Sequence, residues 1–222
     1  MPDFKTIANF RKDNSKAIRG VCRQFVLLCQ QLGLFSENLV AIDGSKFKAV
    51  NNRDRNFTSA KLKRRMEEIE ASISRYLAAL DAADRQTPSA SAPDTGSLED
   101  KIAKLKAQMK ELQKIETQLN DSPDKQVSLT DPDARSMMTR GSGIVGYNVQ
   151  TAVDTKHHLI VAHEVTNVGS DRDQLSPMAK QAREAMGTET LSVVADRGYF
   201  KGEEILACHD ANVTAYVLKP MT

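Results

Sequence analysis

Two aspartates that lie far apart in the sequence each follow a short apolar run, and they are the residues best suited to chemistry. The run 38–42 leads into Asp43 and Gly44, and the run 191–195 leads into Asp196. Runs of this length predict buried strands, and strand ends hold side chains rigidly beside a crevice in α/β folds. An aspartate before a glycine is also an ordinary turn, so the pair carries more weight than Asp43 alone.

Paired carboxylates at rigid positions are suited to holding divalent metal ions. Magnesium prefers carboxylate oxygen, and two such ions about 3.5–4 Å apart can activate an oxygen nucleophile and neutralise charge on a phosphorus and its leaving oxygen. Asp43 and Asp196 thus have the residue type and the expected placement that such metal-dependent phosphodiester chemistry requires, for which Mg²⁺ or Mn²⁺ would be the cofactor.

The elements that would position these acids form an α/β pattern. In chain order we expect a strand at 38–43, a long helical insertion, a β-hairpin within 145–162, a helix at 173–186, a strand at 191–195, a short helix at 203–209 and a strand at 215–218. Apart from the insertion, this order is that of RNase H-like nucleotidyl-transfer domains. The expected fold is thus an RNase H-like mixed sheet with helices.

The insertion carries two runs of apolar residues at heptad spacing. The first run is Leu62, Met66, Ile69, Ile73, Tyr76 and Leu80, and the second is Leu98, Ile102, Leu105, Met109, Leu112 and Leu119, with Glu116 where an apolar residue is expected. The Pro/Ser-rich stretch 88–97 separates them, so we expect an antiparallel coiled-coil hairpin. A structural or dimerising arm is the favoured interpretation. Basic residues at its base leave direct DNA contact open: Lys61, Lys63, Arg64 and Arg65.

The first 34 residues predict one amphipathic helix that stops at Gly33. Cys22 and Cys29 share a face of this helix, where packing is favoured over metal binding. The expected division is therefore a helical N-terminal remnant at 1–36, a catalytic core at 37–57 and 127–222, and a coiled-coil insertion at 58–126.

Composition sets limits on partners and location. The 31 basic and 29 acidic residues leave a net charge of +2, so any DNA-binding surface must be local. Three cysteines without Cys-x-x-Cys spacing suit a reducing cytosol, and His157, His158, His163 and His209 lack metal-ligand spacing. No signal segment and no apolar run of about 20 residues is visible, so we expect a cytoplasmic protein without a membrane partner.

Four ordered blocks resemble those of bacterial insertion-sequence DDE transposases: 41–46 (AIDGSK), 128–135 (SLTDPDAR), 146–150 (GYNVQ) and 195–200 (ADRGYF). The resemblance covers nearly the whole chain. It implies that Asp43 and Asp196 are the first and second catalytic acids and metal ligands. Beside them, Lys46, Arg197 and Tyr199 would contact DNA phosphates or serve packing.

The same resemblance implies the partners. They would be the double-stranded DNA of the element's terminal repeats and of the target, bound by a homodimer that is nucleoid-associated when on DNA. The absence of Trp and the aromatic share of 5% favour duplex contacts over stacking on single strands.

The chain departs from the family pattern at both ends. Family members place a third acid, a glutamate, on a helix beyond the strand that corresponds to 216–218, and they carry a longer N-terminal helical region. Glu203 and Glu204 follow Asp196 too closely to take that third place. We therefore expect a chain truncated at both ends that is weakly active or inactive alone.

Two other interpretations stay open. One is a metal-dependent nuclease of the same fold that uses a further local acid such as Asp154. The other is a non-catalytic remnant that binds DNA or self-associates through the helical arm. For Asp131 and Arg135, in the second block, a turn plus a salt bridge is the simplest expectation.

Overall fold

The computed structural model describes residues 3–35, 38–50, 53–85, 95–139 and 141–220. The chain forms two compact units. The sheet unit consists of Met1–Phe47 and Tyr147–Thr222, and the hairpin unit consists of Lys48–Gly146.

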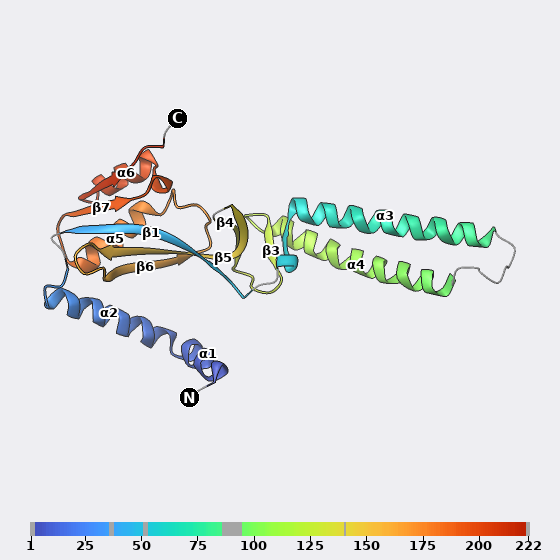
Figure 1. Ribbon diagram of the computed structural model, residues 1–222, viewed down its shortest axis with the longest axis horizontal. Coiled ribbons are helices and arrows are strands. Elements are labelled where there is room, and N and C mark those ends of the chain that lie inside the picture. The colour runs from blue at the N-terminus through green and yellow to red at the C-terminus, as the bar shows by residue number, and fades with distance from the viewer. Residues whose placement is uncertain (1–2, 36–37, 51–52, 86–94, 140, 221–222) are drawn as a thin grey trace. The chain divides into compact units, whose positions relative to one another are not determined.

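The sheet unit is built on a mixed sheet, which confirms the expected α/β class (Figure 1). Strand β5 (Ser142–Asp154) neighbours β1 (Leu39–Lys48), which is followed by β7 (Leu191–Ala195) and β8 (Val213–Val217), while β6 (Ile160–Thr166) pairs with β5. The β1–β7 and β7–β8 pairs are parallel, and β5–β6 is the antiparallel hairpin that the sequence predicts.

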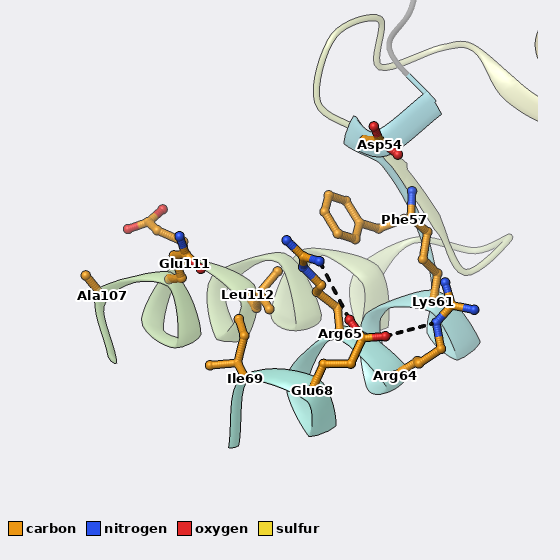
Figure 2. A pocket seen from close by; sticks show the side chains of 11 residues that line it. Asp54, Phe57, Lys61, Arg64, Arg65, Glu68, Ile69, Ala107, Glu111 and Leu112 are labelled. Atoms are coloured by element: carbon orange, nitrogen blue, oxygen red, sulfur yellow. Dashed lines mark ion pairs between the residues drawn. The ribbon is translucent and has the colours of Figure 1, made fainter. Parts of the chain in front are cut away.

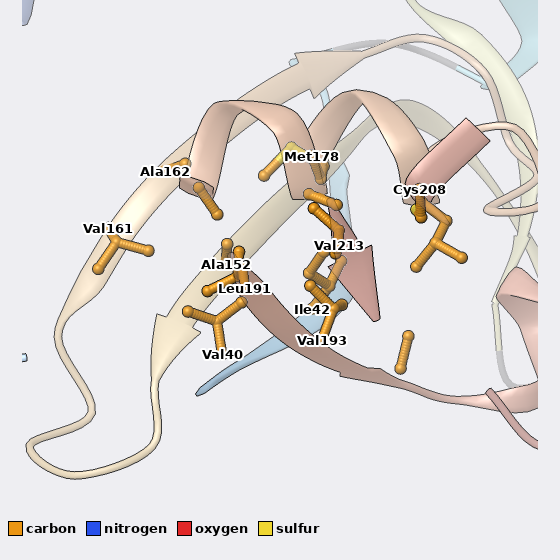
Figure 3. Packing of buried hydrophobic residues seen from close by; sticks show 14 of the residues in the cluster. Val40, Ile42, Ala152, Val161, Ala162, Met178, Leu191, Val193, Cys208 and Val213 are labelled. Carbon is orange, nitrogen blue, oxygen red and sulfur yellow. The ribbon is translucent and has the colours of Figure 1, made fainter. Parts of the chain in front are cut away.

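Helices α5 (Leu175–Met186) and α6 (Gly202–His209) supply the other half of the core. Val40 and Ile42 of β1 pack with Val193 of β7, Met178 of α5 and Cys208 of α6 (Figure 3). Side chains alternate between the two faces of a strand, so the residues between these buried ones point to the opposite face. That outer face carries exposed Ala41, Val194 and Tyr216.

Strand β1 is longer than the sequence predicts. We expected it to end at Asp43, but it continues to Lys48. Its pairing with β7 stops at Ile42, so Asp43 marks the end of the β1–β7 ladder rather than the end of the strand. The missing side chain of Gly44 permits this continuation, because three side chains crowd the space that a Cβ would occupy.

The N-terminal segment contains two helices instead of the single one that we expected. Helix α1 (Phe4–Asp13) and helix α2 (Ser15–Gln31) meet at Asn14, whose backbone is non-helical. The Asn14 side chain donates to the Phe10 carbonyl oxygen at 2.9 Å, and such local bonds compete with helix formation. Gly33 ends the segment at φ 63°, as predicted.

The hairpin unit contains two long helices that run side by side in opposite directions (Figure 1). They are α3 (Ser59–Asp84) and α4 (Thr95–Asp121). At their base lie η1 (Arg53–Arg55) and an antiparallel pair of short strands, β2 (Asn56–Thr58) and β3 (Gln126–Ser128), which the sequence did not reveal. Strand β4 (Arg135–Thr139) pairs with the first residues of β5, Ser142–Gly146. The 88–94 part of the expected connector lies outside the described residues.

The two helices bury an apolar seam: Leu62 and Ile69 of α3, with Leu112, Ile115 and Leu119 of α4. We expected the seam at Glu116, but Ile115 fills that place and Glu116 is exposed. Spacings of three and four residues, from 112 to 115 to 119, keep the seam on one side of the helix. Among the described residues, no helix is long and apolar enough to cross a membrane.

Candidate active site

The structure brings Asp43 and Asp196 together at one edge of the β1–β7 pair. Ile42 of β1 lies opposite Ala195 of β7 in a parallel register, and each aspartate is the next residue along its strand. Both preceding residues face the core, so both aspartates face the outer side of the sheet, where they are exposed. Residues 153 positions apart in sequence therefore become neighbours in the way that two parallel strands require (196 − 43).

Each carboxylate is oriented by a backbone N–H. The Gly44 N–H donates to Asp43 Oδ1 at 2.9 Å, and the Gly198 N–H donates to Asp196 Oδ1 at 2.8 Å. The second bond caps η2 (Arg197–Tyr199), the short turn that follows β7. Backbone donors of this kind restrict the side-chain rotamers of the two carboxylates.

A buried polar network lies against Gly44, on the inner side of β1. Asn148 and Gln150 of β5 are fully buried, and their side-chain amides donate to the same atom, Asp171 Oδ1, at 2.7 and 2.8 Å. Asp171 lies in the loop between β6 and α5, and its Oδ2 is 4.0 Å from Lys46 Nζ. We call Asp171, Asn148, Gln150, Lys46 and Tyr199 together the Asp171 network.

The local sequence pattern assigns no role to Asp171, Gln150 or Asn148. The available signal was the second half of the block 146–150, in which two amide side chains occupy inward positions of a strand. Buried amides require hydrogen-bond partners, so their presence indicates a partner elsewhere in the chain. Nothing in the local pattern points to Asp171 as that partner.

Tyr199 anchors the turn that follows Asp196. Its side chain is only 1% exposed, and its hydroxyl donates a short hydrogen bond to Gln150 Oε1. Burial raises the pKa of the phenol strongly, and the negative charges of Asp171, Asp43 and Asp196 add to this effect. The phenol is therefore neutral, and its burial matches the packing alternative of the two roles considered for Tyr199.

The other two residues near the acids differ from each other. The Lys46 side chain is 19% exposed and faces Asp171, whereas Arg197 is exposed beside Asp196. Arg197 is thus free of the burial that restricts Tyr199.

Asp154 does not join the acid pair. It is fully buried at the end of β5, and its Oδ2 accepts the backbone N–H groups of Lys156 and His157 in the β5–β6 turn. The hydroxyl of the next residue, Thr155, donates to the Leu39 carbonyl oxygen at the start of β1. Leu39 lies four positions before Asp43 in the sequence. The nuclease alternative that used Asp154 as a third acid therefore has no geometric support.

The acid pair suits a hard divalent cation, because carboxylate oxygens are the ligands that Mg²⁺ and Mn²⁺ prefer. Within the described part of the chain, no group of three or more His, Cys, Asp or Glu side chains could hold a metal ion. Glu203 pairs with Lys201 at 3.2 Å, and Glu204 accepts from the Ser176 N–H at 2.9 Å, so both serve the α6 region. Neither glutamate therefore joins Asp43 and Asp196.

The hairpin unit contains a separate cavity of about 710 Å³ at the base of α3 and α4 (Figure 2). Arg64 and Arg65 both pair with Glu68, at 3.7 and 3.6 Å, and Lys61 donates to the Asn56 carbonyl oxygen while lying over the Phe57 ring. Lys61, Arg64 and Arg65 thus make contacts within the unit, and the choice between a structural arm and a DNA contact stays a prediction.

The block at 128–135 forms the expected turn. Asp131 Oδ1 accepts the Asp133 N–H at 3.3 Å, and the Ala134 N–H donates to the Asp131 carbonyl oxygen. The salt bridge of Arg135 is made with Asp124, which lies before β3. Partial burial acts to raise the pKa of Asp124, but hydrogen bonds from Ser122 and Arg135 outweigh it and hold that pKa below its usual value.

The chain thus combines a mixed α/β sheet with two exposed carboxylates that lie one residue beyond the last register pair of a parallel ladder. Residues 35–221 match the sequence profile of the Transposase DDE domain family. The chain belongs to that family. It is therefore an insertion-sequence transposase by family, and such proteins act in DNA transposition and recombination. No curated protein and no solved structure matches the chain.

Proposed function

We propose that this chain is an insertion-sequence transposase that cleaves DNA strands and transfers them at the element ends, with Asp43 and Asp196 as its metal-binding catalytic acids. The single observation that carries the proposal is the β1–β7 register, which puts both carboxylates side by side on the exposed face of the sheet. Family membership supplies the reaction class.

The roles of the residues follow from their positions. Asp43 and Asp196 would hold Mg²⁺ or Mn²⁺, which would activate the attacking oxygen and neutralise charge at the scissile phosphate. Arg197, exposed beside Asp196, would contact a DNA phosphate. The neutral phenol of Tyr199 would keep the turn after Asp196 in place from its buried position.

The outer face of the sheet is exposed beside the acid pair. Ala41, Val194 and Tyr216 form an exposed, largely apolar surface on the same face as Asp43 and Asp196, and Tyr216 is 57% exposed. A helix that packed there could present an acid to the pair, as the third glutamate of DDE transposases does.

The fold and the domain division belong to the same proposal. The strand order β5-β1-β7-β8, with parallel β1, β7 and β8 and an antiparallel β5–β6 hairpin, supports an RNase H-like core. The paired helices α3 and α4 support a coiled-coil insertion at 58–126 between the core segments 37–57 and 127–222, with 1–36 as a helical N-terminal region. Duplex DNA and a second copy of the chain are the expected partners.

Mn²⁺ binding and nicking of a supercoiled plasmid test the proposal on the purified chain. Loss of the aqueous Mn²⁺ signal in electron paramagnetic resonance reports binding without any need for turnover. The variants are Asp43→Asn and Asp196→Asn, which keep the side-chain shape and remove the charge. Asp210→Asn is the matched control, because Asp210 is exposed at the end of α6 and pairs only with neighbouring His209 among the contacts described.

We expect Mn²⁺ binding by the wild type and by Asp210→Asn, and at least tenfold weaker binding by either active-site variant, since each removes one charged ligand. Any nicking by the wild type should disappear in the same two variants. Mn²⁺ affinity that is unchanged by both substitutions would contradict the proposal. Retained DNA binding without metal-dependent nicking in any variant would favour the non-catalytic remnant instead.

A further inference from the structure

Asp171, the one acid of the Asp171 network, is not equivalent to the exposed pair Asp43 and Asp196. Asp171 Oδ1 already accepts two amide hydrogens, from Asn148 and Gln150, and Oδ2 faces Lys46. Its side chain is 20% exposed. A carboxylate that is engaged in this way is suited to organising its neighbours rather than to taking a metal ion.

Asp171 determines how the Gln150 amide is oriented. The amide nitrogen of Gln150 donates to Asp171, so its oxygen is turned towards Tyr199 and accepts the phenol hydrogen. Both amides are fully buried, where an unmade hydrogen bond is costly. The loop before α5 is thereby connected to the turn after β7 through one strand of the sheet.

The same network contacts the backbone beside both proposed catalytic acids. Tyr199 ends the turn that Asp196 caps. Gly44 follows Asp43, and a Cβ at Gly44 would lie 2.5 Å from Gln150 Nε2, 2.6 Å from Asp171 Oδ1 and 3.1 Å from the Tyr199 hydroxyl. The three side chains therefore define the close approach of β1 to the turn that carries Asp196.

We infer that Asp171 is a positioning residue for the acid pair: through Gln150 and Tyr199 it fixes the turn that carries Asp196 against Gly44, and so sets the geometry in which Asp43 and Asp196 meet a metal ion. The inference rests on the proposed function for the role of those two acids. Groups that orient metal ligands from behind affect metal affinity by about 10- to 100-fold in metalloproteins.

The first test asks whether the network is one coupled unit. Asp171→Asn keeps the size and one acceptor oxygen, and Tyr199→Phe removes only the hydroxyl. We expect the loss of Tm in the double variant to be smaller than the sum of the two single losses, because both substitutions break the same chain of bonds. Additive losses would overturn the network as the route of positioning.

The second test separates positioning from plain structural support. Mn²⁺ affinity is measured by electron paramagnetic resonance on variants that circular dichroism shows to be folded. Asp171→Asn should raise the Kd for Mn²⁺ by about tenfold. Asp173→Asn is the matched control: Asp173 lies two residues away, pairs with Lys201 outside the network and should leave the Kd unchanged.

The outcomes distinguish the two proposals. A Kd that is raised in Asp171→Asn, with binding lost in Asp43→Asn and Asp196→Asn, supports both. If Asp171→Asn has the same Kd as the control Asp173→Asn, while Asp43→Asn and Asp196→Asn lose binding, the positioning role alone is overturned. Binding that the two catalytic variants retain overturns the proposed function and the positioning role with it. If Asp171→Asn does not fold, Tyr199→Phe takes its place with the same expected rise in Kd.

Discussion

The Tyr199 hydroxyl donates a hydrogen bond to Gln150 Oε1, and this bond joins residues 49 positions apart in the sequence. Tyr199 belongs to the turn after Asp196, and Gln150 lies on β5 among the core-facing residues. The bond therefore connects the turn that holds one proposed catalytic acid to the strand that lies beside the other.

Removal of the Tyr199 hydroxyl should destabilise the sheet unit. Tyr199→Phe leaves Gln150 Oε1 buried without its donor, which costs about 1–3 kcal/mol of unfolding free energy. Urea unfolding followed by circular dichroism measures the change. Tyr216→Phe is the control, because Tyr216 is 57% exposed and its loss should stay within about 0.5 kcal/mol. Equal effects of the two substitutions would contradict a special role for the buried hydroxyl.

A methyl group at position 44 should damage the site and the fold together. Gly44→Ala places a Cβ against Gln150 and Asp171 at distances shorter than van der Waals contact, so one of them must move. We expect a loss of about 1–3 kcal/mol in unfolding free energy and weaker Mn²⁺ binding.

Gly202→Ala is the matched control for this substitution. No atom lies within 4 Å of a Cβ at Gly202, which is the first residue of α6, so alanine should be neutral or slightly stabilising there. If Gly44→Ala unfolds at the same urea concentration as the wild type, the Asp171 network accommodates the extra methyl group and the prediction is wrong.

The Cys208 thiol should make stability fall at high pH. Burial and the nearby Glu204 charge raise the pKa of Cys208 from its ordinary value of 9.0 to about 11. The folded state therefore keeps its proton while the unfolded state releases it, so the contribution is present below pH 9.0 and is lost as pH rises towards 11. Between about pH 8 and 10 the loss amounts to about 1 kcal/mol.

Urea unfolding at the two pH values checks this effect against Cys208→Ala. The variant is expected to be less stable at both, because it leaves a small cavity, but its stability should fall less over the interval. Identical pH dependence in both proteins would contradict the role of the Cys208 thiol in the loss of stability.

Exposed Cys22 should react with a thiol reagent at pH 8 in the folded protein, whereas buried Cys208 should not.

The seam between α3 and α4 should account for the stability of the helical hairpin. Leu62→Ala and Leu119→Ala each remove a side chain that is 2% exposed, with an expected cost of about 2–5 kcal/mol. Thermal loss of helical circular dichroism measures it. Leu77→Ala on the same helix α3 is the control, since Leu77 is 45% exposed and should change the midpoint little. If Leu62→Ala or Leu119→Ala has the same thermal midpoint as Leu77→Ala, the packing of the seam between α3 and α4 is contradicted.

The helices and strands were largely readable from local patterns. Heptad spacing placed α3 and α4, and short apolar runs placed β1 and β7, because the burial of one face imposes a period that the sequence must show. The errors came where a single side chain decided the backbone: Asn14 interrupts the N-terminal helix, and Gly44 lets β1 run on to Lys48.

The sequence by itself determined the α/β class and the transposase family, and it predicted the two acids, since each depends on short ordered motifs and on residue periodicity. Only the tertiary structure decided that Asp171 joins Gln150 and Tyr199, that Asp154 caps a turn instead, and that Ile115 takes the seam position beside Glu116. The physical reason is that hydrogen bonds and packing act between atoms that meet in space. A carboxylate in a loop carries no local mark of the amides, distant in sequence, that it will satisfy.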